Sequence, residues 1–169
     1  MALRWLRAIL LLPGMVLVVV PALLLTMFRE DGSAFAAADP AAPGFWLGLA
    51  VGIPGLALSL WTARLFHRHG RGTAAPWDPP TRLVVRGPYR HVRNPMISGV
   101  VLMLLAECLI LECLPLAVWL AVFACANAFY LPAREEKRLV ARFGEDYEVY
   151  RANVPRWIPR LRPWSAPGA

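Results

Sequence analysis

The sequence has little of what a disulfide-bonded or metal-binding protein needs. It contains three cysteines, an odd number, and none forms a CxxC pair or a Cys/His spacing typical of a zinc site. Cys108, Cys113 and Cys125 all lie in apolar segments, where cysteine usually packs as a small hydrophobic side chain. We therefore expect no disulfide framework and no metal site. No internal repeat is evident.

Polar residues are also scarce. Hydrophobic residues make up 58% of the 169 residues, and the mean hydropathy is +0.49. An ordinary soluble domain is nearer ~45–50% apolar, and it needs polar residues to cover its surface. The composition therefore predicts one membrane-embedded domain over residues 1–169, an all-α polytopic bundle of helices.

Basic residues outnumber acidic ones by 18 to 11, and almost all of the basic residues are arginine. The net charge is +7, and seventeen of the eighteen cations are arginines. In a soluble protein this would suggest a nucleic-acid partner. Here the arginines lie between and after the apolar segments, which the positive-inside rule explains better. We therefore expect no nucleic acid among the partners.

Four apolar runs are long enough to cross a membrane, or nearly so. They cover about residues 8–28, 44–66, 95–111 and 115–131. The first could instead be a cleaved signal peptide, because Ala34-Phe35-Ala36 resembles a cleavage site, but its apolar core exceeds the ~7–15 residues of such peptides. We expect two N-terminal spans in residues 1–66 and a catalytic core in residues 67–169.

Details of these runs predict how the helices pack and where they face. Glu112, Cys113 and Leu114 alone separate the last two runs, which predicts an antiparallel helical hairpin. Gly48 and Gly52 form a G-x-x-x-G pair that would permit close helix approach, although such a pair is also common by chance. With the N-terminus inside, seventeen cations fall on the inner side and only Arg29 on the outer side. Both termini are therefore expected in the cytoplasm.

The most informative stretch is Arg86–Ile97, which reads R-G-P-Y-R-H-V-R-N-P-M-I. Asn94 is a good N-cap, and Pro95 suits the first helical position because it has no N–H to leave unpaired. A helix N-terminus carries unpaired amides and a partial positive charge. Because arginines surround it, this helix N-terminus is predicted to bind an anion.

Farther along, the chain turns amphipathic. Leu139, Phe143, Tyr147 and Tyr150 recur at helical spacing. Gly144 is expected to end one helix before acidic residues begin another. The last residues, with Trp157, Pro159 and Trp164 among arginines, are typical of a segment at the membrane interface.

The predicted hairpin brings the start of the third run close to the end of the fourth. The arginine-rich Arg86–Ile97 stretch would then face the acidic pair Glu135 and Glu136, with Asn127 about one helical turn before that exit. Basic and acidic groups on opposite walls would match a zwitterion.

At this point several motifs carry a family resemblance. They are G-P-Y-R-x-V-R-N-P-M at the start of a membrane helix, then E-E, F-G-E-x-Y and a terminal V-P-R-x-I-P. Over about residues 81–159 the chain resembles the isoprenylcysteine carboxyl methyltransferase family, as a bacterial-type member of the inner membrane, and it is also similar to the phospholipid methyltransferases. The resemblance implies an integral-membrane methyltransferase that uses S-adenosylmethionine.

The resemblance also implies a cofactor pocket. The pocket would fall on Thr81, Arg82, Leu83, Val84, Tyr89, Asn94, Pro95, Met96 and Ile97, and on one of Glu135 or Glu136. The residues closest to the chemistry would be His91, Arg93, Asn94 and Arg134. Tyr89 could stack on adenine, and His91 is the one candidate base in the motif. Alternatively, His91 and the arginines of this stretch could simply meet lipid headgroups, and the acidic pair could serve the dipole of its own helix.

The chain departs from the prenylcysteine enzymes in two places. They read His-Pro where this chain has Asn94-Pro95, and they carry an arginine where it has Phe129–Pro132, although Arg134 could substitute. We therefore expect a small lipophilic acceptor, a carboxylate, thiol or amine, that enters from the inner leaflet. The alternatives are a phospholipid or amine N-methyltransferase, a non-catalytic scaffold that binds anionic lipid, and an NADPH-dependent reductase. Glu107, inside the third run, is a functional candidate because ionisable groups are rare in membrane spans. It lies near the outer end of the run, however, and we expect it to be protonated and hydrogen-bonded to a neighbouring helix.

Overall fold

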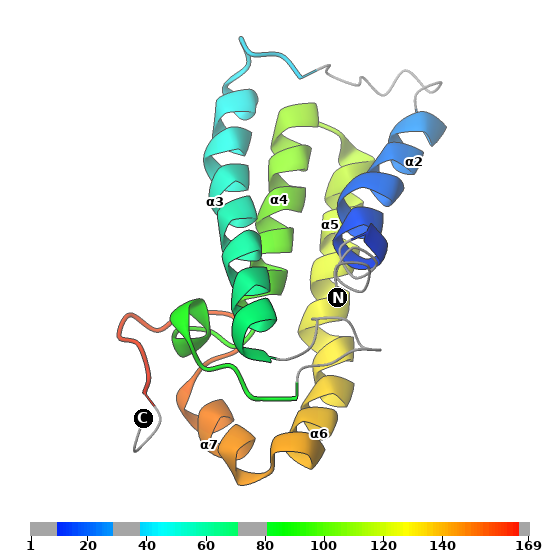
Figure 1. Cartoon of the computed structure of the whole chain (residues 1–169). Coiled ribbons are helices and arrows are strands. Elements are labelled where there is room, and N and C mark those ends of the chain that lie inside the picture. The colour runs from blue at the N-terminus through cyan, green and yellow to red at the C-terminus, as the bar shows by residue number, and fades with distance from the viewer. Residues whose placement is uncertain (1–9, 29–37, 71–80, 166–169) are drawn as a thin grey trace. The chain divides into compact units, whose positions relative to one another are not determined.

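The computed structural model describes residues 10–28, 38–70 and 81–165. Every regular element in these ranges is a helix, so the all-α prediction is confirmed (Figure 1). The elements are η1 (Leu10–Val19), α2 (Val20–Met27), α3 (Pro43–Leu65), η2 (Phe66–Gly70), η3 (Gly87–Arg90), α4 (Pro95–Leu111), α5 (Leu114–Cys125), η4 (Ala126–Tyr130), α6 (Leu131–Phe143) and α7 (Glu145–Asn153).

The chain divides into two compact units. One consists of Met1–Ala57 and Gly99–Ala126, and the other of Leu58–Ser98 and Asn127–Ala169. Each unit thus combines segments that are far apart in the sequence. The expectation of a single domain with a catalytic core after residue 66 stays a prediction.

In the first unit, α3 and α4 approach each other along a row of glycines. A Cβ atom added at Gly48 would lie 2.5 Å from the Ile110 side chain and 2.9 Å from the Ala106 carbonyl oxygen. One added at Gly52 would lie 2.8 Å from the Cβ of Ala106. Distances this short leave no room for a side chain. The structure therefore confirms that the G-x-x-x-G pair permits close packing of two helices.

Replacing Gly48 with leucine should therefore destabilise the protein. The new side chain would overlap Ile110 and the α4 backbone, and overpacking of this kind costs about 1–3 kcal/mol. The measurement is the thermal unfolding midpoint of the detergent-solubilised protein. Ala50→Leu is the matched control, because Ala50 is exposed on the same helix and should tolerate the same side chain. Equal midpoints for the two variants would contradict the prediction.

A second contact of this unit compensates for a proline. Residues Leu10–Val19 form a widened π-helical segment, in which the carbonyl of residue i pairs with the amide of residue i+5. For Val16 that partner would be Pro21, which has no amide. The indole N–H of Trp119, on α5, donates to the Val16 carbonyl at 3.1 Å instead. Tertiary packing thus satisfies a backbone group that the local sequence leaves unpaired.

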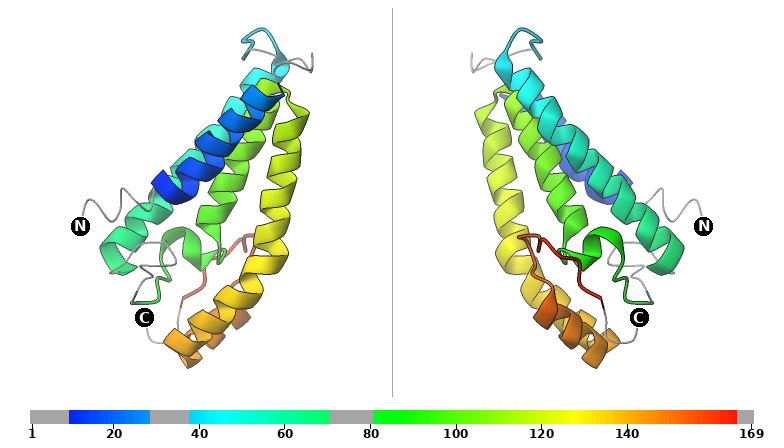
Figure 2. Two further views of the ribbon diagram at one scale, coloured as in Figure 1. Left: turned by 90° about the vertical axis from the view of Figure 1, so that its right-hand side faces the viewer. Right: turned by 90° about the vertical axis from the view of Figure 1, so that its left-hand side faces the viewer.

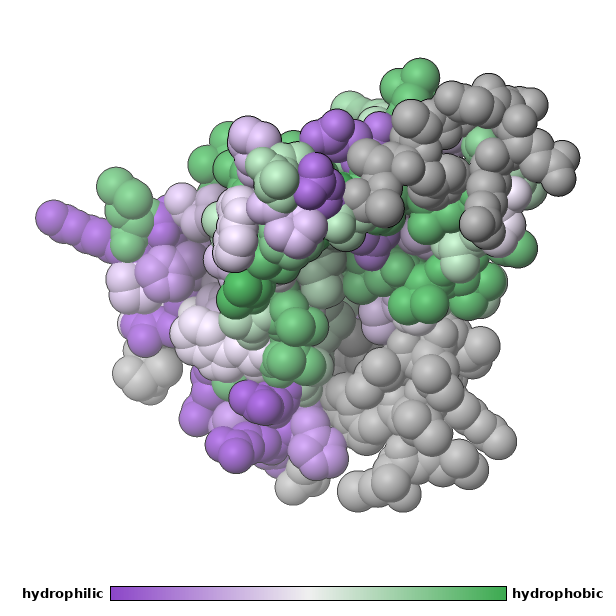
Figure 3. All heavy atoms as spheres, turned by 90° about the horizontal axis from the view of Figure 1, so that it is seen from above, coloured by the Kyte–Doolittle hydropathy of each residue, from purple (hydrophilic) through white to green (hydrophobic). Residues whose placement is uncertain are grey.

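The predicted helices occur where the apolar runs lie. The third run is α4 with the expected bounds, and the chain reverses direction after Glu112, whose φ of 45° lies in the left-handed region (Figure 2). The helix Pro43–Gly70 is long and apolar enough to cross a membrane, whereas Pro13–Met27, Pro95–Leu111 and Leu114–Phe129 are shorter apolar helices. Hydrophobic residues reach the surface of the described part (Figure 3). The count of four spans stays a prediction.

In the second unit, α6 and α7 pack together. Gly144 joins them with a φ of 55°, and its amide donates to the Val140 carbonyl at 2.8 Å, so the predicted helix end at Gly144 is confirmed. Tyr147, Tyr150 and Val154 form the buried core of this unit, and the side chain of Trp164 packs against it. One detail differs from expectation. Helical structure continues from α5 through the π-helical segment η4 into α6, so the acidic pair lies in a helix with no break before it.

Candidate active site

A tight turn holds the start of the Arg86–Ile97 stretch. Gly87 has a φ of 55°, a conformation that residues with side chains rarely adopt. A Cβ atom there would also lie 3.0 Å from Leu65 and 3.1 Å from Trp61. Pro88, with its fixed φ, then opens the short 3-10 helix η3. The Gly-Pro pair therefore shapes the turn and lets it pack closely against the end of α3.

The C-terminal segment is hydrogen-bonded along this stretch, which sequence reasoning did not predict. The amides of Arg93 and Asn94 donate to the carbonyls of Pro155 and Arg156, at 2.9 and 3.4 Å. Farther along, the Arg160 amide donates to the His91 carbonyl at 3.0 Å. The amides next to the start of α4 thus already have partners. An anion at this helix end would have to use the amides of Met96 and Ile97, which have no carbonyl one turn earlier in the helix.

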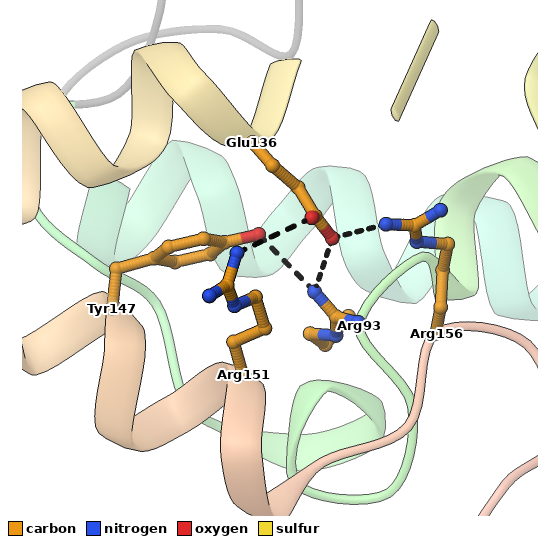
Figure 4. A network of polar contacts seen from close by, with 5 residues as sticks. All are labelled: Arg93, Glu136, Tyr147, Arg151 and Arg156. Atoms are coloured by element: carbon orange, nitrogen blue, oxygen red, sulfur yellow. Dashed lines mark hydrogen bonds and ion pairs between the residues drawn. The ribbon is translucent and has the colours of Figure 1, made fainter. Parts of the chain in front are cut away.

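Glu136 is the centre of a cluster of charged groups in the second unit (Figure 4). Its Oε1 accepts a hydrogen bond from Arg93 Nη1 at 2.6 Å and a second from Arg156 Nη2. Its Oε2 lies 3.6 Å from Arg151 Nη1. The hydroxyl of Tyr147 accepts a weaker hydrogen bond from Arg93 at 3.3 Å. Three guanidinium groups therefore surround one carboxylate, and the cluster carries an excess of positive charge.

The cluster controls the ionisation of its members. Desolvation alone would raise the pKa of Glu136, but the hydrogen bonds from Arg156 and Arg93 outweigh it and hold the pKa below its usual value. Burial raises the pKa of Tyr147, although the neighbouring Arg93 opposes the shift. At neutral pH the carboxylate is therefore charged and the phenol is protonated.

The low pKa of Glu136 predicts a specific dependence of stability on pH. The unfolded carboxyl titrates near pH ~4.3, so the stabilisation is complete above that pH and is lost as the pH falls through the lower folded value. Because the side chain is partly exposed, we expect a loss of about 1 kcal/mol or less. The measurement is the unfolding midpoint from pH 6 down to pH ~3. Glu136→Gln, which cannot titrate, should show a smaller decrease than the wild type over this interval.

A pocket opens beside the cluster. It is lined by Arg93, Asn94, Glu135, Glu136, Leu139, Tyr147 and Arg156. Its volume is only about 10 Å³, roughly the space of one water molecule, so a larger ligand requires side chains at its rim to move. Desolvation raises the pKa of Glu135, while Arg156 opposes that shift. Within the described part of the chain, the buried Nε of Arg93 has no hydrogen-bond partner. That N–H is available for an acceptor from outside the protein.

Tyr89 lies in the core of the second unit, not at its surface. Tyr89 is only 6% exposed, and its ring packs edge to face against that of Phe66, with the ring centroids 5.3 Å apart. Burial raises the pKa of Tyr89 well above its usual value. The buried hydroxyl of Tyr150 donates to the Tyr89 carbonyl at 2.7 Å, which fixes the backbone of the motif. The stacking of Tyr89 on adenine stays a prediction.

The other predicted site residues are spread over the second unit. Thr81 and Arg82 are exposed, Leu83 packs against the tyrosine core, and Val84 is buried. Pro95 is fully buried at the start of α4, with Met96 and Ile97 half-buried after it. The side chain of Arg134 lies outside the described part of the structure. The structure thus brings Arg93, Asn94 and the acidic pair around one pocket.

A larger groove of about 430 Å³ lies elsewhere in the same unit. It is lined by Leu58, Trp61, Gly87, Pro88, Arg90, His91, Val92, Pro159 and Pro163. The ring Nδ1 of His91 is 2.8 Å from the carbonyl oxygen of Arg160, which can only accept, so this nitrogen carries the proton. His91, the predicted base, therefore lines a different cavity from the one beside Glu136.

Sequence reasoning missed three members of the charged cluster. Tyr147 and Arg156 were both present in the quoted motifs, F-G-E-x-Y and V-P-R-x-I-P, and their place in a motif was a usable signal. Arg151 follows Tyr147 by one helical turn and carries no motif signal. The structure thus brings residues from three separate motifs together beside Glu136.

The comparison with family models defines the class of protein. The family model described as phospholipid methyltransferase matches residues 43–146, more than half of the chain. The chain belongs to the phospholipid methyltransferase family, a family of methyltransferases. Searches of the curated proteins and of the solved structures gave no significant match.

Proposed function

We propose that this protein is an integral-membrane methyltransferase that uses S-adenosylmethionine to methylate a small lipophilic acceptor at the inner membrane surface. The family match supports the methyltransferase class. The observation that carries the proposal is the meeting of Arg93, Glu136, Tyr147 and Arg156, from four separate motifs, at one pocket.

The charges of this pocket fit the amino-acid end of the cofactor. Three guanidinium groups face a single carboxylate, and the buried Nε of Arg93 still has an N–H to donate. A second carboxylate, such as that of the methionine part, would offset part of this excess positive charge. Glu135 lines the same pocket and would suit the ammonium group. Thr81–Val84, Tyr89 and Asn94–Ile97 remain the proposed walls for the rest of the molecule.

The role of the protein in this reaction is mainly to position the reactants. S-adenosylmethionine, when bound, supplies a methyl group on a positively charged sulfur. Arg93 and Arg156 would hold the carboxylate, and Glu136 keeps both guanidinium groups in place. Correct placement supplies most of the rate in such a displacement. A carboxylate or thiolate acceptor needs no base, and Arg134 would then hold the acceptor's charge.

The proposed setting is a membrane crossed four times, with both termini in the cytoplasm. The long apolar helix Pro43–Gly70 and the three shorter apolar helices support it. The charge pattern also supports it, because a four-span topology with the N-terminus inside would put seventeen of the eighteen cations on the inner side. A bacterial inner membrane is the proposed location, and the pocket would then open toward the cytoplasmic leaflet.

A phospholipid or amine N-methyltransferase is the second candidate, favoured by the description of the family. An amine must lose a proton before it attacks, so this reading needs a base. His91 is the candidate, because its Nδ1 donates to the Arg160 carbonyl and its Nε2 keeps a lone pair in the neutral ring. The alternative in which the protein is not an enzyme is a non-catalytic scaffold that binds anionic lipid.

Binding of S-adenosylmethionine to the detergent-solubilised protein tests the proposal. We expect saturable heat in a calorimetric titration, and at least tenfold weaker binding for Glu135→Ala. The control is Glu148→Ala, which removes an exposed carboxylate on α7 that does not line the pocket. Transfer of labelled methyl into a total lipid extract would then identify the acceptor. If neither S-adenosylmethionine nor NADPH binds, the two methyltransferase hypotheses and the NADPH-dependent reductase all fail, and the lipid-binding scaffold remains.

A further inference from the structure

The groove of about 430 Å³ plays no part in the proposed binding of S-adenosylmethionine. Its volume lies within the roughly 300–1,000 Å³ of typical ligand pockets. Most of its lining is apolar, including Leu58, Trp61 and Val92, whereas Arg90 and His91 are its polar members among the described residues. A mostly apolar groove with basic residues at one place fits an amphiphilic ligand that has an apolar chain and an anionic headgroup.

The guanidinium of Arg90 has donors to spare for such a head. Its Nε donates to the Trp164 carbonyl at 2.7 Å, and its Nη2 donates to the Ser165 hydroxyl. Arginine carries five N–H groups, so the remaining donors are enough for a phosphate. No carboxylate lines the groove within the described ranges, and the sequence has no acidic residue after Glu148. The charge therefore favours an anion.

The surroundings of the groove are suited to lipid. The C-terminal segment, which contributes Pro159 and Pro163, also holds Ile158 and Leu161 with 81% and 97% of their surface exposed. Backbone hydrogen bonds to the Arg90–Asn94 stretch fix this segment, so the two side chains cannot simply turn inward. Trp61 is 53% exposed on the helix that is long enough to cross a membrane. Large apolar groups held outward in this way typically meet a membrane.

We propose that this groove binds one acyl chain of an anionic membrane phospholipid whose phosphate lies on Arg90. The lipid is a bound component of the protein, not the methyl acceptor. In this arrangement His91 lines the lipid site, and its ring Nδ1 donates to the Arg160 carbonyl. The inference goes beyond the proposed methyl transfer and does not depend on cofactor binding.

Lipid binding to the full chain in detergent tests this inference without any cofactor. Dioleoyl phosphatidylglycerol and dioleoyl phosphatidylcholine have the same chains and differ in headgroup charge. We expect the anionic lipid to bind about fivefold more tightly, as one arginine–headgroup contact predicts. Inorganic phosphate at the same concentration should not bind measurably, because it lacks the chain. Equal affinity for the two lipids, or binding of phosphate alone, would overturn the proposal.

Two pairs of variants separate the headgroup contact from the chain contact. Arg90→Gln should reduce the preference to about one, whereas Arg162→Gln, with the same charge change outside the groove, should keep it. Trp61→Ser should weaken both lipids about fivefold, and Trp46→Ser, at an exposed tryptophan of the same helix, should weaken neither. Trp61→Ser leaves the hydrogen bonds of Arg90 in place, so it remains informative if Arg90→Gln fails to fold.

A last arm distinguishes a bound lipid from a substrate. The purified protein is incubated with labelled S-adenosylmethionine and each lipid in turn, and the lipid is recovered and counted. The inference expects no label in the anionic lipid. If phosphatidylglycerol became labelled, and Trp61→Ser abolished this labelling, the groove would be the acceptor site. That result would overturn the assignment. Failure of S-adenosylmethionine to bind would sink the proposed function alone, since the lipid titration needs no cofactor.

Discussion

Arg93→Gln is expected to lower methyl transfer by about 100-fold and to weaken S-adenosylmethionine binding by a similar factor. Arg93 places one N–H on Glu136 at 2.6 Å, another near Tyr147, and keeps its buried Nε without a partner in the described structure. If this N–H meets the cofactor carboxylate, its loss removes a charge-assisted hydrogen bond and disturbs the placement of the methyl group. Effects of two to three orders of magnitude are usual for such a donor, and we expect about 10².

The measurements are a calorimetric titration and the rate of labelled methyl transfer. Arg93→Lys keeps the charge but not the planar fork, so it should recover only part of the activity. Arg64→Gln, at an exposed arginine that does not line the pocket, is the matched control. Folding should survive, because Arg156 and Arg151 still face Glu136. If the folded Arg93→Gln variant bound the cofactor normally, the arginine cluster could not be part of the cofactor site.

Tyr150→Ala is expected to cause the largest loss of stability, about 3–5 kcal/mol. Tyr150 is 3% exposed, and its ring lies beside those of Tyr147 and Trp164, with centroids 6.2 and 5.9 Å away. Its hydroxyl donates to the Tyr89 carbonyl. The substitution would open a cavity between α7 and the C-terminal segment and would leave that carbonyl without its donor.

Tyr150→Phe separates the two contributions. It keeps the ring and removes only the hydroxyl, so it should cost about 1–2 kcal/mol, the usual loss when a buried hydrogen bond is broken. The measurement is urea or thermal unfolding in detergent, followed by intrinsic fluorescence. Tyr150→Phe should also weaken cofactor binding more than its stability loss explains, since the hydroxyl fixes the backbone of the Arg86–Ile97 stretch. Equal losses for the two variants would show that the ring contributes nothing.

The helical fold class and some of the helix boundaries could be predicted because their causes are local. Asn94-Pro95 starts α4, Gly144 ends α6, and the apolar runs have the length and composition of the helices observed. Even the glycine spacing in α3 pointed to a close contact, since only a residue without a side chain allows it. Each of these features depends on a residue and its neighbours within a turn or two of helix.

The site could be predicted only in part, for a physical reason. The meeting of the Arg86–Ile97 stretch with the acidic pair followed from the motif order and the hairpin, and the ion pair of Arg93 with Glu136 confirms that they lie together. The hydrogen bonds from the C-terminal segment could not be foreseen. Pro155, Arg156, Arg160 and Trp164 lie more than sixty residues from their partners, and no periodicity encodes that pairing.

The sequence by itself therefore determined the helical class, the bounds of α4, the end of α6 and the family to which the protein belongs. The tertiary structure alone decided how the acidic pair is used: three arginines surround Glu136, while Glu135 lines the rim of the pocket. It also decided that Tyr89 is a core residue and that His91 lines the larger groove. Local rules specify where a helix begins and ends. Which side chains meet depends on packing between distant segments, and a charge has no partner until the chain has folded.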